Sequence, residues 1–178
     1  MRSAALRVAV VAGAAAALFA SAASAGEQLS SAAIEILDPR RDVADFALAD
    51  TGGRTVRLGA LRGRVVLLHV WATWCAACVE EMPTMEALGG ALRDREFSVL
   101  ALNLMEEPEV VAEFLRTMRV TFPVLLDDGA IGIQYAARGI PASYLIDRRG
   151  RLAARSVGAR DWTAEASRRL IERLLAEP

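Results

Sequence analysis

The stretch that decides the fold runs from residue 65 to residue 78 and reads Val65-Val66-Leu67-Leu68-His69-Val70-Trp71-Ala72-Thr73-Trp74-Cys75-Ala76-Ala77-Cys78. Its first half is a nearly continuous apolar run with β-branched residues, which is typical of a strand buried on both faces. Residues 75–93 then show helical spacing, and Pro83 inside them is expected to kink the helix. The two cysteines therefore stand where a buried strand turns into a helix.

Two cysteines separated by two residues at a helix start are suited to reversible disulfide chemistry. Cys75 would lie at the helix N-terminus, where the partial positive charge stabilises the thiolate that acts as nucleophile. Cys78 lies one turn further on and can attack a mixed disulfide to release the product. A purely structural disulfide would close a very short ring and contribute only about 2 kcal/mol through loop entropy. The pattern therefore favours a redox-active pair.

The rest of the chain predicts a mixed α/β fold. Apolar runs at residues 46–48 and 55–58 flank the pair Gly52-Gly53, which indicates a β-hairpin. Further strands are expected at residues 97–104, 122–126, 143–147 and 151–157, and helices at residues 108–118 and 163–176. Because strands first alternate with helices and then pair as a hairpin, we expect a mixed sheet that is covered on both faces.

The composition excludes several classes of function. All 21 basic residues are arginine and the formal net charge is −1, so lysine-dependent Schiff-base and P-loop chemistry is excluded. No basic stripe is left for a nucleic-acid backbone. One histidine and two cysteines cannot build a tetrahedral zinc site of four Cys or His ligands. We expect no metal and no other cofactor.

The first 25 residues predict an export signal. Arg2 and Arg7 precede an uncharged apolar run at residues 8–20, and Ala23-Ser24-Ala25 supplies the small residues that signal peptidase requires. An uncleaved membrane anchor is the alternative, since about 20 apolar residues can span a bilayer. In both cases we expect the remainder in the periplasm or another extracytoplasmic space, where disulfides persist. Residues 26–42 are expected to form a linker or a loose N-terminal arm, followed by one domain at residues 43–178.

Seven segments of this domain occur in the order in which one known family carries them. They are Asp45-Phe46-Ala47-Leu48, Leu61-Arg62-Gly63-Arg64-Val65-Val66, Val70-Trp71-Ala72-Thr73-Trp74-Cys75, Glu81-Met82-Pro83, Gly139-Ile140-Pro141, Leu145-Ile146-Asp147-Arg148-Arg149-Gly150 and Gly158-Ala159-Arg160-Asp161-Trp162. Residues 43–178 thus resemble the TlpA-like and ResA-like thiol-disulfide oxidoreductases. The resemblance implies a thioredoxin fold with a central mixed sheet flanked by helices, an N-terminal β-hairpin and a central βα insertion.

The resemblance also implies roles for individual residues. Pro141 aligns with the cis-proline that faces the disulfide, and the backbone at Ile140 is expected to pair with an extended substrate segment. Trp74 is expected to form the surface beside the nucleophile. Glu81 aligns with a carboxylate that helps to move the proton of Cys78, although a solvated acid like Glu80 is the alternative.

His69 and the arginines near residue 150 receive more ordinary interpretations. His69 precedes Cys75 by six residues and could perturb the cysteines from beneath. A lone strand histidine is more often simply packed and hydrogen-bonded, which is the interpretation favoured here. Arg148, Arg149 and Arg151 are interpreted as a solvated hairpin tip.

The resemblance implies an exported disulfide reductase that a membrane thiol-transfer protein re-reduces. Cys75 would attack the substrate disulfide and Cys78 would resolve the mixed species. Expected substrates are apocytochrome c, copper-delivery proteins of cytochrome oxidase assembly or other exported cysteine proteins, and the sequence does not choose among them. Ala76-Ala77 departs from the family, where proline often precedes the second cysteine, so a disulfide-donating oxidase stays open. A peroxiredoxin is a further alternative. A Sco-like copper chaperone is disfavoured. Such proteins have three residues between their cysteines and a distal histidine, whereas here two residues separate Cys75 from Cys78 and the only histidine precedes them.

Overall fold

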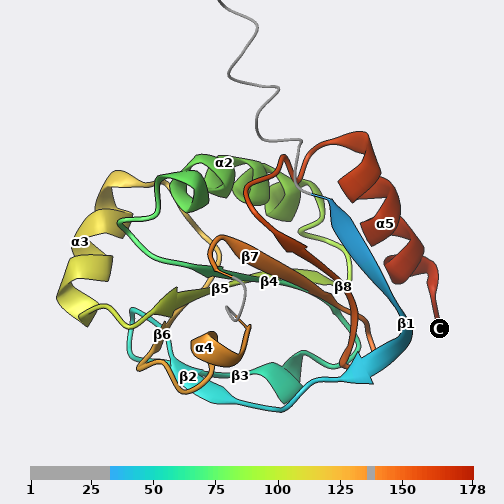
Figure 1. Ribbon diagram of the computed structural model, residues 1–178, viewed down its shortest axis with the longest axis horizontal. Coiled ribbons are helices and arrows are strands. Elements are labelled where there is room, and N and C mark those ends of the chain that lie inside the picture. The colour runs from blue at the N-terminus through green and yellow to red at the C-terminus, as the bar shows by residue number, and fades with distance from the viewer. Residues whose placement is uncertain (1–32, 136–138) are drawn as a thin grey trace, which may run out of the picture.

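The computed structural model describes residues 33–135 and 139–178, and its centre is a six-stranded mixed sheet in the order β1-β8-β7-β4-β5-β6 (Figure 1). The pairs β4·β5 and β5·β6 are parallel, whereas β4·β7, β7·β8 and β8·β1 are antiparallel. The strands are β1 (Ile34–Asp42), β4 (Val65–Trp71), β5 (Phe97–Leu104), β6 (Val124–Asp127), β7 (Ala142–Ile146) and β8 (Arg151–Val157).

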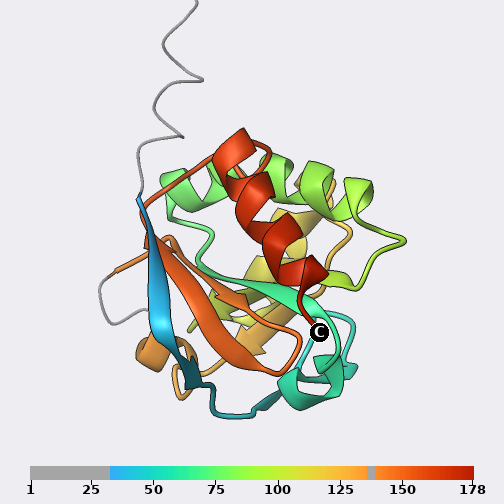
Figure 2. The same cartoon turned by 90° about the vertical axis from the view of Figure 1, so that its right-hand side faces the viewer.

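Three helices cover one face of this sheet, namely α2 (Ala76–Ala91), α3 (Pro108–Thr117) and α5 (Glu165–Ala176). The parallel connections β4–α2–β5 and β5–α3–β6 place their helices on the same side, as right-handed crossovers require. The opposite face is covered by the hairpin of β2 (Ala47–Ala49) and β3 (Thr55–Arg57), the 3₁₀ turn η1 (Leu58–Leu61) and the short helix α4 (Gly132–Tyr135). Figures 1 and 2 show α2 and α5 on the side of the sheet away from this hairpin.

Strand β4 lies at the centre of the core and all seven of its residues are buried. Leu67 and Trp71 face the side of α2, whereas Leu68 and Val70 face the hairpin and α4. Each such side chain, when fully buried, contributes roughly 1.5–3 kcal/mol of transfer free energy. The prediction of a strand buried on both faces is confirmed, and it explains why the apolar run is continuous rather than alternating.

The expected fold class is confirmed as well. The hairpin over Gly52-Gly53 is present with β2 and β3 paired antiparallel, and β5 and β8 have the expected bounds. Helix α5 begins at Glu165, two residues later than expected. Helix α3 leads from β5 to β6, which adds a parallel strand outside β5.

The expectation of a linker or loose arm over residues 26–42 is wrong for its second half, which forms β1. This strand pairs with β8, but the register shifts between Ile36 and Arg41, and the Asp38–Pro39 peptide is cis. Only Leu37 among its nine residues is buried. Because the strand lies at an edge and is interrupted, it shows no alternation of apolar and polar residues that could have revealed it.

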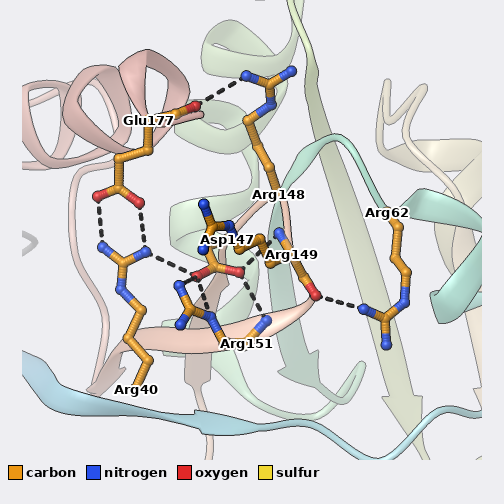
Figure 3. Close-up of polar contacts among 7 residues, drawn as sticks. All are labelled: Arg40, Arg62, Asp147, Arg148, Arg149, Arg151 and Glu177. Carbon is orange, nitrogen blue, oxygen red and sulfur yellow. Dashed lines mark hydrogen bonds and ion pairs between the residues drawn. The ribbon is translucent and has the colours of Figure 1, made fainter.

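A network of charged groups around Asp147 ties β1 to the β7–β8 turn and to the end of α5 (Figure 3). The Asp147 carboxylate is buried and accepts hydrogen bonds from Arg40 Nη1 at 2.8 Å, from Arg151 Nε at 3.0 Å and from the Arg151 backbone N–H at 2.9 Å. Arg40 also makes a bidentate contact with Glu177 at 2.5 and 2.6 Å. Although desolvation opposes it, hydrogen bonding from the Arg151 backbone and from Arg40 holds the pKa of Asp147 below its ordinary value.

This network corrects the interpretation of Arg148 and Arg151 as part of a solvated hairpin tip, whereas Arg149 is exposed as expected. Arg151 is bonded to Asp147, and Arg148 donates from Nε to the Gly63 carbonyl at 2.9 Å and from Nη1 to the Glu177 carbonyl at 3.0 Å. The order of charged residues in the sequence does not reveal the network around Asp147, because Arg40 and Glu177 come close to it only in the folded chain.

The predicted export signal at residues 1–25 lies outside the described residues. Among residues 33–135 and 139–178, no helix is both long enough and apolar enough to cross a bilayer.

Candidate active site

The two cysteines lie at the start of α2, directly after the loop that follows β4. Cys75 is the N-cap residue of α2 and forms a disulfide with Cys78, with the two Cα atoms 5.3 Å apart. Its Sγ accepts a hydrogen bond from the Cys78 backbone N–H at 3.2 Å. The first turn of α2 contains no acidic residue that would cancel the positive end of the helix dipole. These features favour the thiolate of Cys75 once the disulfide is reduced.

The surroundings of the two sulfurs differ. Cys75 exposes 8% of its surface, whereas Cys78 is completely buried among apolar residues that include Trp71 and Met82. A protein substrate can therefore reach Cys75 first. Cys78 is shielded from a protein substrate and lies within bonding reach of the Cys75 sulfur.

The three residues expected to contact a substrate lie around this pair. Trp74 directly precedes Cys75 and exposes 70% of its side chain. The Ile140–Pro141 peptide is cis, and Ile140 packs against the apolar cluster that contains both cysteines. Pro141 is buried, and its carbonyl accepts a hydrogen bond from the Gly158 N–H at 2.8 Å. The structure thus brings the segment before β7 to the end of β4 where the cysteines lie.

Glu81 is completely buried, so the alternative of a solvated acid is wrong; its neighbour Glu80 is exposed. Its Oε2 accepts a hydrogen bond from the Arg160 backbone N–H at 3.0 Å, and its Oε1 accepts one from Trp162 Nε1 at 3.2 Å. Burial raises the pKa of Glu81 to about 7, although the hydrogen bonds from Trp162 and Arg160 oppose that rise. A carboxyl with such a pKa can take up or release a proton near neutral pH.

His69 lies beneath α2 and beside this carboxyl. Its Nδ1 is 3.0 Å from Ser143 Oγ and 3.2 Å from Glu81 Oε1, and its side chain is completely buried. Burial lowers the pKa of His69 to about 3, so the imidazole is neutral at physiological pH. The interpretation of a packed, hydrogen-bonded histidine is confirmed. The contact of His69 with Glu81 could not be expected from the sequence, because it forms only when α2 packs over β4. The other partners of Glu81 come from distant segments, namely Ser143, Arg160 and Trp162.

A second carboxylate, Glu106, fixes the loop that leads into Cys75. Its two oxygens accept hydrogen bonds from the Thr73 backbone N–H at 2.7 Å, from Thr73 Oγ1 at 2.5 Å and from Asn103 Nδ2 at 2.8 Å. The loop after β4 is thereby anchored to the end of β5. Glu106 carried no signal in the sequence, since it stands among other acidic residues at a predicted helix start. The described residues contain no group of three or more His, Cys, Asp or Glu side chains placed to hold a metal ion.

Comparison with known families and curated proteins gives consistent matches. Residues 39–155 match the model of the AhpC/TSA family. The thiol-disulfide oxidoreductase ResA of a Bacillus cereus strain is 32% identical over 120 residues, which cover 66% of this chain and 69% of that protein. The thioredoxin-like protein YneN of Bacillus subtilis is 36% identical over 109 residues, which cover 60% of this chain and 64% of that protein.

Solved structures also resemble this fold. A protein described as the thiol:disulfide interchange protein DsbE from Chlorobium tepidum superposes with a TM-score of 0.72 at 33% identity, over 77% of this chain and 97% of that one. A secreted thiol-disulfide isomerase from Corynebacterium glutamicum gives a TM-score of 0.70 over 90% of this chain and 99% of that one. Its identity is 18%, so this second likeness shows the fold alone.

Proposed function

Because the chain belongs to the AhpC/TSA family and is a thiol-disulfide oxidoreductase of the ResA and DsbE type, we propose that it reduces disulfides of exported proteins. The Cys75 thiolate attacks the substrate disulfide, which forms a mixed disulfide and releases one substrate thiol. Cys78 then attacks Cys75 Sγ and releases the second substrate thiol. Two electrons pass to the substrate, and the Cys75–Cys78 disulfide remains.

The observation that carries this proposal is the buried carboxyl of Glu81, one helical turn after the buried Cys78. Release of the substrate requires Cys78 to lose its proton in surroundings that disfavour a thiolate. A base with a pKa of about 7 is suited to accept that proton near neutral pH. Glu81 thus supports the role of Cys78 as the thiol that resolves the mixed disulfide.

Substrate contact is assigned to Trp74, Ile140 and Pro141. The exposed Trp74 provides an aromatic surface beside Cys75, and the backbone at Ile140 pairs with an extended substrate segment, as in strand addition. This mode of binding tolerates different substrate sequences, because backbone groups provide the hydrogen bonds. This suits an enzyme that acts on the cysteines of several exported proteins.

The proposed location is the periplasm, where residues 1–25 are removed on export and the thioredoxin-like domain is released. Apocytochrome c and copper-delivery proteins of cytochrome oxidase assembly are the proposed substrates, and a membrane thiol-transfer protein restores the dithiol. Mass spectrometry of the periplasmic protein is expected to give a chain that begins at Gly26. A chain that begins at Met1 in the membrane fraction would support the uncleaved anchor instead.

The direction of electron flow is tested by the reduction potential of the Cys75–Cys78 pair, measured by equilibration of the purified protein with defined thiol buffers. We expect a value near that of thioredoxin, about −270 mV, which makes the protein a reductant that depends on an electron donor. A value near that of the periplasmic oxidant DsbA, about −120 mV, would make it a disulfide donor and overturn the proposal.

A further inference from the structure

His69, Ser143 and Ser156 stand opposite one another on β4, β7 and β8, in a row that crosses the sheet beneath α2. Residues directly opposite each other point to the same face of a sheet. On β4 this is the face of Leu67 and Trp71, which pack against α2. The small Ser143 beside His69 allows Glu81 to reach this row from α2.

Four polar groups surround the Glu81 carboxyl. The backbone N–H of Arg160 and the indole N–H of Trp162 are fixed donors, because neither group can accept a hydrogen bond. The Ser143 hydroxyl, 3.4 Å from Oε1, and the His69 imidazole can either donate or accept. His69 therefore has two possible roles, which depend on the ring nitrogen that carries the hydrogen.

The surroundings of the imidazole decide between these roles. Nε2 of His69 is buried and has no hydrogen-bond partner in the described part of the chain. A buried N–H without an acceptor is tolerated less well than a bare acceptor atom. The hydrogen therefore belongs on Nδ1, which lies 3.0 Å from Ser143 Oγ and 3.2 Å from Glu81 Oε1.

We propose that His69 is a positioning residue for Glu81. Its Nδ1–H donates to the Glu81 carboxylate, directly and through the Ser143 hydroxyl, and holds that carboxylate in the charged form that accepts the proton of Cys78. The proposal rests on the proposed function, in which the proton leaves Cys78 Sγ for a Glu81 oxygen. It assigns a role to the one buried imidazole beneath the active-site helix.

The charged groups that face this pair act in a consistent direction. Arg160, from the segment before α5, is buried and its positive charge favours the Glu81 carboxylate, while Asp161 next to it favours the charged form of Arg160. On β7 the facing residue is the neutral Ser143. Removal of the His69 donor therefore raises the pKa of Glu81 further, so that less of the carboxylate is present at neutral pH.

The first test reads the tautomer directly. The chain contains one histidine, so the imidazole ¹⁵N signals of the tag-free protein need no assignment. We expect a neutral ring with its hydrogen on Nδ1 between pH 5 and pH 8. A hydrogen on Nε2 would overturn the inference without any bearing on the proposed function. This measurement needs no substitution, so it stands even where variants fail to fold.

The second test uses the pH profile for resolution of a mixed disulfide at Cys75. In the His69→Phe variant we expect the ionisation of Glu81 to move about one pH unit higher. At a pH below that ionisation, the rate of resolution then falls roughly tenfold. His69→Asn is expected to restore most of that change, because the asparagine amide can donate from the position of Nδ1. Ser156→Ala is the matched control, since its hydroxyl bonds to the Ala33 carbonyl instead.

The outcomes separate this inference from the function on which it rests. A folded His69→Phe protein with the profile of the unmodified protein would overturn the role of His69. A shift that persists unchanged in the Glu81→Gln background would overturn it too, because the effect would then bypass Glu81. If instead Glu81→Gln leaves the profile unaltered from pH 5 to pH 9, it is the proposed role of Glu81 that fails.

Discussion

Cys75 and Cys78 are identical side chains that the first turn of α2 places in different surroundings. Cys75 caps the helix and reaches the surface, while Cys78 is sealed among apolar residues. Since the chemistry of a thiol depends on access and on thiolate content, this difference fits the proposed roles, in which Cys75 attacks the substrate and Cys78 resolves the mixed disulfide.

Trapping experiments test that division. The Cys78→Ser variant is expected to accumulate a covalent complex with a disulfide substrate, because nothing resolves the bond formed at Cys75. The Cys75→Ser variant is the matched control and is expected to form none. Non-reducing gel electrophoresis of reduced variants after exposure to substrate reads the result. A complex that forms through Cys78 in the Cys75→Ser protein would contradict the assignment.

Glu81 makes the stability of the fold depend on pH. Its pKa rises from 4.5 to about 7 on folding, so the native protein keeps a proton that the unfolded chain has lost. The free energy of unfolding is therefore expected to fall as pH rises from about 4.5 to about 7, by about 3 kcal/mol from this group. Glu81→Gln should lack this slope. Urea unfolding across the range measures it.

Glu80, the exposed neighbour of Glu81, supplies the control for the pH dependence of unfolding. Glu80→Gln changes the same charge on the same helix without altering a buried group, so its unfolding curve should run parallel to that of the unmodified protein. Parallel curves for Glu81→Gln as well would show that the carboxyl at residue 81 does not hold its proton in the native state.

At the scale of elements, the local patterns were sufficient for β4, α2 and the hairpin. Val65 to Trp71 form a run whose burial is complete, and the Cys75–Cys78 spacing fixes one turn of helix, so nearby residues determine each outcome. The partners of Glu81 were not predictable in this way. Ser143, Arg160 and Trp162 meet it only because β7 and the segment before α5 are folded against α2.

Helix α4 shows how tightly one element is held against the sheet. A Cβ atom at Gly132 would lie 2.6 Å from Leu104 Cδ1 and 2.8 Å from Asp127 Oδ2. Asp127 Oδ2 also accepts the Gly132 N–H at 2.6 Å, so this side cannot easily give way. We expect Gly132→Ala to destabilise the protein by about 1–3 kcal/mol, as overpacking does. The midpoint of urea unfolding measures the change.

For Gly90 in α2 we expect the opposite change in stability. At Gly90 an added Cβ would meet no atom within 4 Å, and the residue lies inside a helix. Gly90→Ala is therefore expected to stabilise the protein by about 0.5–1 kcal/mol. If Gly90→Ala lowered the free energy of unfolding as much as Gly132→Ala, crowding at Gly132 would not be the cause of the loss.

On the scale of the whole molecule, Arg40 joins three regions that are far apart in sequence. It links β1 to Asp147 in the β7–β8 turn and to Glu177 after α5. Arg40→Ala is expected to lower the free energy of unfolding by about 1–2 kcal/mol, because Asp147 is buried and loses one of its partners. Thermal unfolding is a suitable measurement.

An exposed ion pair gives the comparison for Arg40. Arg169 pairs with Glu165 on the surface of α5, with both side chains largely in solvent. Arg169→Ala should cost at most about 0.5 kcal/mol. Equal losses for the two variants would mean that the Asp147 network contributes no more than a surface pair.

The interrupted strand β1 also bears on how this molecule meets other chains. An exposed sheet edge offers unpaired backbone groups that can recruit a foreign strand and start aggregation. Here one edge is broken by a register shift, by Pro39, which lacks an N–H, and by charged residues, while β6 at the other edge has only four residues. Neither edge offers a long template. An unfolded chain that meets this molecule therefore finds no long, regular edge along which it could add a strand.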